Sequence, residues 1–298
     1  MTQPAERGEE TLLGASFVRE LELLRRRLEQ RARSGAAGEQ VSRRRGGSAE
    51  FHEHRPYAPG DDLRRIDWAA YARTGEPVVK VFRAEEDTVV RLVVDASASL
   101  DFGVPTKLAQ ARRLAAAIGY MALAESERVQ VAVCSGGAVR EHAPARGRNG
   151  ILGFLRQMEA IAPAGRVELA RAVDRVVEKS ARPGMLAIAS DFLDPDPLVP
   201  SLSRAVQGGH DLVLVHVVAR EELEPPYEGD LALEDAETGA VVEVTLDRAT
   251  LDAYLRRFAG LCASLRAFAK RHGATYVRVV TDEPLEPAVR RIVARAVD

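Results

Sequence analysis

The chain has 298 residues, enough for one large domain or two modest ones, and 46% of them are apolar, which suits a globular protein with an aliphatic core. Its 42 basic and 44 acidic residues nearly cancel, so no overall field draws it to nucleic acid or to an anionic membrane. No apolar run approaches the ~20 residues that cross a bilayer, and residues 1–10 lack the basic start and apolar core of a signal peptide. We therefore expect a cytoplasmic protein with no membrane span and no nucleic-acid partner.

The first predicted element is an amphipathic helix over residues 9–33. Its apolar side chains recur three or four positions apart, which is the spacing of one helix face. They are Leu13, Phe17, Leu21, Leu24 and Leu28. This stripe predicts that the helix packs on another part of the protein.

Residues 34–47 are rich in glycine, alanine and arginine, which predicts a connector. Three consecutive arginines, 43–45, lie there, and three more, 25–27, lie in the preceding helix. Basic triplets bind nucleic acid in some proteins, but without interleaved aromatic residues a solvated surface is the simpler interpretation. A nucleic-acid-binding role through these clusters remains an alternative.

A dense block of turn-forming and charged residues occupies positions 55–73. Its prolines and glycine predict a turn, and the charged residues after the turn predict a salt-bridged cluster against the indole of Trp68. The block is either a polar network that ties a small β-rich layer to the main domain or a surface that binds a partner. The candidate partner-binding residues are Arg55, Asp61, Arg64, Asp67 and Trp68.

Two histidines precede this block. His52 and His54 are two positions apart, so on a strand they share one face and form a possible pair of ligands for a transition metal. Because no third ligand is evident nearby in the sequence, we predict exposed or hydrogen-bonded histidines instead.

From residue 89 onward, apolar runs alternate with helical periods. The runs are RLVVD, VQVAVC, MLAIAS, LVLVHVV and TYVRVV, and helices are predicted near 106–124, 150–161, 167–180, 197–207 and 247–272. Apolar strands separated by helices are typical of an α/β fold, with a mostly parallel sheet covered by helices on both faces. Residues 229–246 break this rhythm with two alternating runs around Thr238-Gly239, which predict an inserted β-hairpin.

Some polar residues of these runs are expected in the core. Cys134 lies in a strand-like run far from Cys262, so a buried thiol is a better prediction than a disulfide, in agreement with a reducing compartment. His216 lies inside LVLVHVV, where a hydrogen-bonded core histidine is expected.

A polar cluster follows the first apolar strand directly. Asp95, Ser97 and Ser99 form a D-x-S-x-S sequence, and Ser190-Asp191 stands at the end of another central strand. Ligands bind at the carboxyl ends of the strands in open α/β sheets, and carboxylate and hydroxyl oxygens suit Mg²⁺, Mn²⁺ or Ca²⁺. The alternative is a strand-to-helix turn, since serine and aspartate also cap helices.

Two features of the sequence resemble a known family. The D-x-S-x-S cluster resembles the start of the metal-ion-dependent adhesion site (MIDAS) of von Willebrand factor A-like domains. The pattern R-x-Y-x-x-G-D-D-x-R-x-I-D-W-x-x-x-A-R, from Arg55 to Arg73, resembles the signature of the bacterial domain-of-unknown-function 58 family. The resemblance covers residues 46–298 and implies a von Willebrand factor A-like domain over 88–298, a β-rich signature segment over 46–87, and an N-terminal helix with a basic linker over 1–45.

The resemblance also implies roles for the clustered residues. Ser97 and Ser99 would bind the ion directly, and Asp95 and Asp191 would bind it through water. The usual threonine ligand has no counterpart, because Val167 stands at its position, so a weak Mg²⁺ or Mn²⁺ site is expected. The neighbours of this valine, Arg166 and Glu168, are further candidates for contacts with a partner.

The function implied by the resemblance is that of a non-enzymatic adaptor. Family members work with a MoxR-type AAA+ ATPase, so the expected partner is such an ATPase or its client, in protein assembly or metal insertion. The chain has no G-x-x-x-x-G-K-[ST] phosphate-binding loop, so the partner would hydrolyse the ATP. A metal-dependent hydrolase is the alternative, although no general base is evident beside the cluster.

Overall fold

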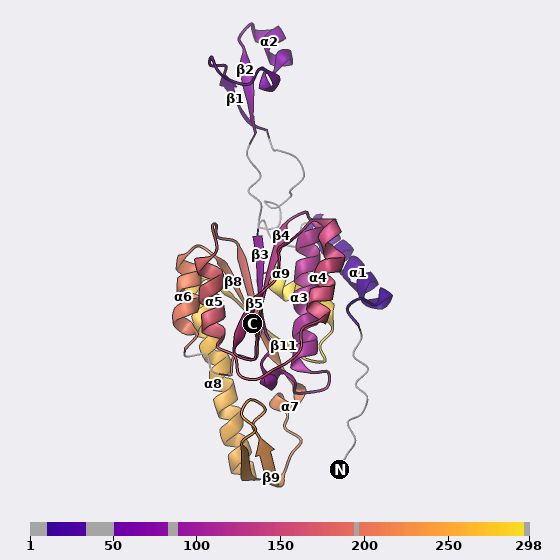
Figure 1. The fold of residues 1–298 in the computed structure, drawn as a ribbon, viewed down its shortest axis with the longest axis vertical. Coiled ribbons are helices and arrows are strands. Elements are labelled where there is room, and N and C mark those ends of the chain that lie inside the picture. Colours follow the sequence, from indigo (N-terminus) through magenta and orange to yellow (C-terminus); the bar gives the residue numbers. More distant parts are fainter. Residues whose placement is uncertain (1–10, 34–50, 83–88, 194–196, 295–298) are drawn as a thin grey trace. The chain divides into compact units, whose positions relative to one another are not determined.

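The computed structural model describes residues 11–33, 51–82, 89–193 and 197–294, and the predicted connector with arginines 43–45 lies outside them. The chain divides into a larger unit, residues 1–37 and 88–298, and a smaller unit, residues 38–87. Each unit is described by itself (Figure 1).

The smaller unit is a two-stranded antiparallel sheet with short helical turns in the connection between its strands. Its elements are β1 (Phe51–Pro56), the 3-10 helix η2 (Leu63–Arg65), α2 (Trp68–Thr74) and β2 (Val78–Phe82). Asp67 begins α2, since its Oδ1 accepts hydrogen bonds from the N–H groups of Ala69 and Ala70, both at 3.1 Å. Gly75 ends the helix with a left-handed φ of 75°, a conformation that glycine adopts without strain. The predicted small β-rich layer is confirmed.

The larger unit is built on a seven-stranded sheet with the order β11-β8-β7-β3-β4-β5, in which β6 also pairs with β4. Five strands are parallel: β3 (Val89–Asp95), β4 (Arg128–Ser135), β7 (Met185–Ser190), β8 (Asp211–Val218) and β11 (Thr275–Val280). The short strands β5 (Ala138–Glu141) and β6 (Ala145–Arg146) run antiparallel to β4.

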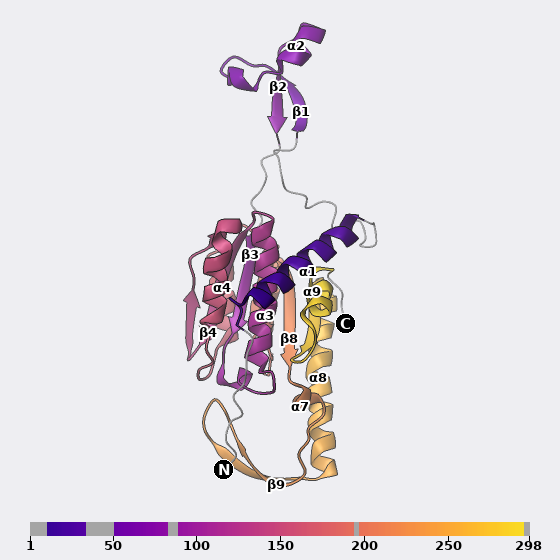
Figure 2. The same cartoon turned by 90° about the vertical axis from the view of Figure 1, so that its right-hand side faces the viewer.

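Helices cover both faces of this sheet, as Figures 1 and 2 show. One apolar cluster joins the sheet to α1 (Ala15–Arg33), α3 (Lys107–Ala124), α4 (Ile151–Glu159) and α9 (Leu285–Val293), and the other joins it to α5 (Leu169–Glu178), α6 (Val199–Gln207) and α8 (Arg248–His272). Successive residues of β3 enter opposite clusters, because Leu92 and Val94 pack on one face and Val93 on the other. The predicted α/β fold is therefore confirmed.

Three short elements complete the larger unit. They are the 3-10 helices η3 (Ala98–Leu100) and η4 (Arg148–Gly150) and the single turn α7 (Arg220–Leu223) after β8. The predicted hairpin is present as β9 (Gly229–Glu234) paired with β10 (Val241–Leu246), and it leads directly into α8.

The N-terminal helix, predicted over residues 9–33, starts later than predicted, at Ala15. Leu12, at 2% exposure, is buried in the core, whereas Leu13, at 39%, is exposed. The helix begins only at Ala15, so Leu13 precedes it and does not follow the helical spacing that places Phe17, Leu21 and Leu24 in the core. The helix α9 and the strands β5 and β6 were not predicted from the sequence.

The predicted core residues are confirmed. Cys134 and Cys262 are both buried and free. His216 is 1% exposed, and its Nδ1 lies 2.9 Å from the hydroxyl of Tyr276 on the neighbouring strand. Burial is the main cause that lowers the pKa of His216 to about 4, so the ring is neutral at pH 7.

Candidate functional site

The topology of the sheet has a switch point between β3 and β7. The chain passes from β3 to β4 on one side and then crosses to β7 on the other side, so consecutive connections leave in opposite directions at this point. Ligands bind outside the carboxyl ends of the strands at such a switch point. Asp95 is the last residue of β3, and Asp191 directly follows β7. Local strand geometry thus brings together residues that are distant in the sequence.

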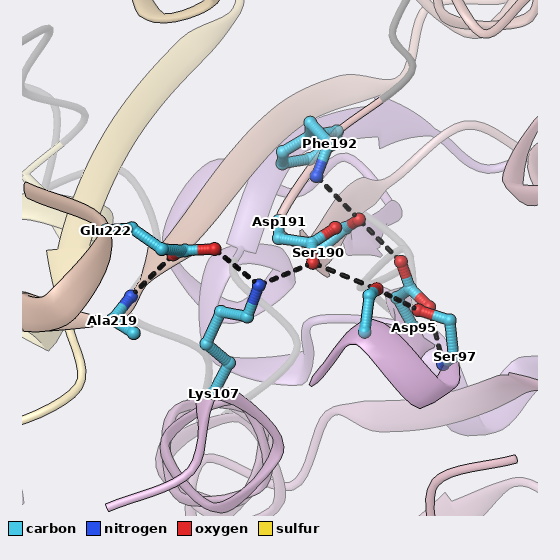
Figure 3. Close-up of polar contacts among 9 residues, drawn as sticks. Asp95, Ser97, Lys107, Ser190, Asp191, Phe192, Ala219 and Glu222 are labelled. Atoms are coloured by element: carbon cyan, nitrogen blue, oxygen red, sulfur yellow. Dashed lines mark hydrogen bonds and ion pairs between the residues drawn. The ribbon is translucent and has the colours of Figure 1, made fainter. Parts of the chain in front are cut away.

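Hydrogen bonds join the predicted site residues into one cluster (Figure 3). The hydroxyls of Ser97 and Ser99 lie 2.9 Å apart, and Ser99 Oγ donates to Asp191 Oδ2 at 3.0 Å. Asp95 Oδ1 accepts the backbone N–H of Ser97 at 2.9 Å, and Asp95 Oδ2 accepts the hydroxyl of Ser190 at 2.6 Å. The structure therefore brings Asp95, Ser97, Ser99 and Asp191 together.

The cluster is largely shielded from water. Asp95 is 5% exposed, Asp191 4% and Ser97 2%, whereas Ser99 is half-buried and is the most accessible of the four. Burial, reinforced by the charge of Asp191, raises the pKa of Asp95 to about 6, against the opposing effect of its hydrogen bonds. Two buried carboxylates side by side need a cation, and the structure supplies one from the protein itself.

That cation is the ammonium group of Lys107, which the sequence analysis missed. Its Nζ lies 2.8 Å from Asp191 Oδ2 and 2.8 Å from Glu222 Oε1, and its side chain is 2% exposed. Asp191 Oδ2 thus accepts hydrogen bonds from both Lys107 and Ser99. Glu222 is fixed in turn, since its Oε2 accepts the backbone N–H of Ala219 at 2.8 Å (Figure 3).

The pairing outweighs the cost of burying a charged lysine. Burial alone would lower the pKa of Lys107, but the charges of Asp191 and Glu222 together raise it above its usual value. Lys107 therefore stays protonated, and part of the negative charge of the site is compensated without an added ion.

A signal for Lys107 exists in the sequence. Lys107 is the first residue of α3, after the cap in which Thr106 Oγ1 accepts the N–H of Ala109. A cation is unfavourable at this end of a helix dipole, and the first turn of α3 contains no acidic residue. A lysine that begins a largely apolar helix, KLAQARRLAAAIGYMALA, therefore indicates a specific anionic partner elsewhere in the chain.

The loop between α4 and α5 lies against the cluster. The backbone of Ala164 donates to Ala96 O at 2.9 Å, and the backbone of Ala98 donates to Gly165 O at 2.9 Å. Val167 packs against the apolar cluster on the α5 side of the sheet, and Glu168 is exposed at the start of α5. Val167 thus contributes to packing.

Arg166 connects this loop to the inserted hairpin. Its side chain is 74% exposed, and its Nε lies 3.8 Å from Oε2 of Glu237, a residue in the turn between β9 and β10. Burial raises the pKa of Glu237, and the charges of Asp191 and Asp235 add to this effect while Arg166 opposes it. The turn of the hairpin therefore lies near the candidate site.

The donor set determines which ion the site would accept. In the described part of the chain, no group of three or more His, Cys, Asp and Glu side chains is placed to hold a metal ion. A cation here would depend on the hydroxyls of Ser97 and Ser99, which suit a hard divalent ion. These residues fit Mg²⁺ or Mn²⁺, and the neutralisation of Asp191 by Lys107 favours low affinity.

The other predicted partner-binding residues lie in the smaller unit. Arg55 pairs with Asp61 at 2.7 Å, and the hydrogen bond from the N–H of Ala58, followed by that from Arg55, lowers the pKa of Asp61. Arg64 is exposed, and His54 Nε2 lies 3.0 Å from Asp67 Oδ2, so the prediction of a hydrogen-bonded histidine is confirmed for His54.

Trp68 is the first residue of α2, directly after the cap residue Asp67. The ring contact described for Trp68 is an edge-on contact with Tyr71, 6.2 Å between centroids, and the charged cluster on the indole stays a prediction. Trp68 is 63% exposed. The side chains of His52 and Arg65 lie outside the described residues.

None of the helices in the described ranges combines the length and apolarity that a bilayer span requires.

Several solved structures resemble this chain at low sequence identity. They include the conserved hypothetical protein BatB from Bacteroides thetaiotaomicron, at 16% identity and a TM-score of 0.47 over 70% of this chain and 98% of that chain. A von Willebrand factor type A protein from Catenulispora acidiphila matches at 13% identity and a TM-score of 0.35, over 62% of this chain and 43% of that one.

Closer relatives are known from sequence. Uncharacterized proteins of Mycobacterium bovis and Mycobacterium tuberculosis are 36% identical over 256 residues, which cover 84% of this chain and 80% of each relative. The pattern of the family described as "Protein of unknown function DUF58" matches residues 53–266. This range contains the whole signature block from Arg55 to Arg73, the D-x-S-x-S cluster and both partners of Lys107. The chain therefore belongs to the DUF58 family.

Proposed function

We propose that this protein is a non-enzymatic interaction module that binds a partner protein at the carboxyl edge of its sheet. The observation that supports the proposal is the cluster of Asp95, Ser97, Ser99 and Asp191, which presents a half-buried serine hydroxyl beside Asp191, whose charge Lys107 compensates. This arrangement recognises charge and hydrogen-bond geometry, and both contribute to specificity in protein interfaces.

The chemistry of the site favours binding over catalysis. The nearest histidine on a central strand, His216, is neutral and buried against Tyr276. Asp191 already accepts hydrogen bonds from Lys107 and Ser99, so it is poorly suited to remove a proton from water. Asp95 likewise accepts a hydrogen bond at each carboxylate oxygen, from the N–H of Ser97 and the hydroxyl of Ser190, whereas a hydrolase would need a base free to accept that proton.

A weakly bound Mg²⁺ or Mn²⁺ belongs to this proposal. Ser97 and Ser99 would hold the ion, with Asp95 and Asp191 behind them. When bound, the ion would supply an open position for an oxygen ligand of the partner. The compensation of Asp191 by Lys107 keeps the cluster stable without the ion, so occupancy would follow the concentration of the metal and of the partner.

The proposed partner is a MoxR-type AAA+ ATPase or its client, in the cytoplasm, in protein assembly or metal insertion. The family resemblance motivates this choice, and the site supplies a surface on which such a partner can dock.

The test is co-purification of the host's MoxR-type ATPase with the full chain. The disruptive variant is the Ser97→Ala, Ser99→Ala double substitution, which removes both hydroxyls but leaves the pairing of Lys107 with Asp191 intact. The matched control is the Ser203→Ala, Ser264→Ala double substitution, which removes two exposed hydroxyls that bond only within their own helices. We expect recovery with the wild type and the control and loss with the site variant. Equal recovery with all three proteins would contradict the proposal.

A further inference from the structure

The hairpin of β9 and β10 is the least integrated part of the larger unit. Its two strands pair only with each other in the described part of the chain, as a separate two-stranded sheet. Figures 1 and 2 both show it beyond the end of β8, beside α7 and the first turns of α8. A two-stranded hairpin alone is marginally stable in water, so its other contacts determine what it does.

The register gives this hairpin one apolar face. Directly opposed residues point to the same side of the sheet, and the pairs Val242↔Leu233 and Val244↔Leu231 are apolar throughout. Each pair on the opposite face includes a polar residue, and in the pair Thr245↔Asp230 the two side chains share a hydrogen bond of 2.7 Å. The hairpin is therefore amphipathic across its sheet.

Only the inner half of the apolar face is covered. Leu231, Val244 and Leu246, which lie toward the base of the hairpin, are partly buried. The strand β10 also contacts α8. Toward the turn, Leu233 is 48% exposed and Val242 is 62% exposed, although both lie on the same face as the covered residues. A contiguous apolar pair is thus left open to solvent.

The hairpin's own charged residues are all acidic, and Arg166 is a basic neighbour at its turn. Residues 228–247 include seven acidic residues and no lysine, arginine or histidine. The acidic residues are Glu228, Asp230, Glu234, Asp235, Glu237, Glu243 and Asp247. Such a surface repels acidic partners and attracts basic ones, mainly through the rate of association.

The hairpin surface is continuous with the candidate site. The turn places Glu237 beside Arg166 of the loop that lies against Asp95–Ser99. Asp235 shapes this turn, because its Oδ1 accepts the N–H of Glu237 at 2.8 Å. A partner seated on the sheet edge would meet the hairpin in the same contact.

We propose that the open apolar pair, Leu233 and Val242, is a docking surface for a partner segment in which apolar side chains alternate with lysine or arginine. The inference rests on the proposed function, since it assigns the second half of the same binding surface. The apolar side chains of the segment would cover Leu233 and Val242, and its basic side chains would meet the acidic margin of the hairpin.

The test uses a short synthetic peptide of alternating leucine and lysine, titrated into the full chain by calorimetry, so that it does not depend on the ATPase. The disruptive variant is Val242→Ser. The matched control is Val241→Ser, because Val241 is 61% exposed on the adjacent position but lies on the opposite face. Both substitutions make the same chemical change in the same strand, so a general loss of β-structure would affect them equally.

We expect Val242→Ser to weaken peptide binding at least about tenfold, and Val241→Ser to leave it within about twofold. Added salt should weaken binding to the wild type, because the contact includes charge. Equal effects of the two substitutions, or no binding by the wild type, would overturn the inference. Peptide binding without recovery of the ATPase would instead contradict the proposed function and leave the hairpin assignment standing.

Discussion

Replacement of Lys107 by methionine tests the electrostatic design of the site. The two side chains have similar lengths, so the substitution mainly removes the ammonium group that lies 2.8 Å from both Asp191 and Glu222. Asp191 and Asp95 would then be buried side by side without a compensating cation. Loss of one partner from a buried ion pair costs about 3–5 kcal/mol of unfolding free energy. A divalent ion bound at the site would restore the charge balance that the lost ammonium group provided.

The assay is chemical unfolding at pH 7, in chelator and in Mg²⁺. We expect Lys107→Met to lose about 3–5 kcal/mol in chelator, and to recover part of this loss in Mg²⁺, because an ion that binds only the folded state stabilises it by about 2.7 kcal/mol at a hundred times its Kd. The control is Lys179→Met, which removes a lysine that is 52% exposed and pairs with Glu141 at the surface, and which should cost less than about 1 kcal/mol. A loss for Lys107→Met no larger than that of the control would refute the reasoning.

Three further predictions follow from other parts of the molecule. Burial lowers the pKa of His216 to about 4, so the unfolded state binds the proton of this residue more tightly, and His216 should reduce the unfolding free energy as pH falls from about 6.5 toward 4. Between pH 7 and 5, a His216→Gln variant should lose about 2 kcal/mol less unfolding free energy than the wild type, and equal losses by the two proteins would contradict this. Gly119→Ala places a Cβ against the ring of Phe154, where α3 meets α4, and should lower the free energy of unfolding in urea by about 1–3 kcal/mol, whereas Gly153→Ala, with open space around its Cβ, should raise it by about 0.5–1 kcal/mol. If Gly119→Ala proved the more stable of the two variants, α3 and α4 would have to separate readily. Calorimetric titration with Mn²⁺ should show weak binding by the wild type and no binding by the Ser97→Ala variant. Identical titrations of the two proteins would contradict the assignment of the Ser97 hydroxyl as a ligand.

The sequence predicted the larger fold because its signals are local. The central strands are near-continuous apolar runs, and the helices between them have caps or clear apolar periods, such as Thr106 before α3 and Asp247 before α8. The strands β5 and β6 were missed because AVRE and AR carry no apolar run. They form because the edge of β4 offers unpaired backbone groups, a cause that lies outside their own sequences.

The candidate site, too, was predicted from the sequence only where its residues follow a local pattern. Asp95, Ser97 and Ser99 follow one strand, so a local pattern was sufficient to propose them, and Asp191 follows from the rule that strand ends converge. Lys107 and its partners Asp191 and Glu222 are separated by 84 and 115 residues, and each reaches the site from a different element. No spacing rule joins such residues, although the unfavourable position of Lys107 at a helix start gave a usable signal.

The central claim is that the carboxyl edge of the sheet binds a protein partner. The most direct measurement is the Kd between the purified full chain and the host's purified MoxR-type ATPase, for the wild type and for the Ser97→Ala, Ser99→Ala variant. We expect the variant to bind at least about tenfold more weakly and to remain folded, with an unfolding free energy lowered by about 2–4 kcal/mol through the two lost hydrogen bonds. Equal dissociation constants for the two proteins would contradict the claim.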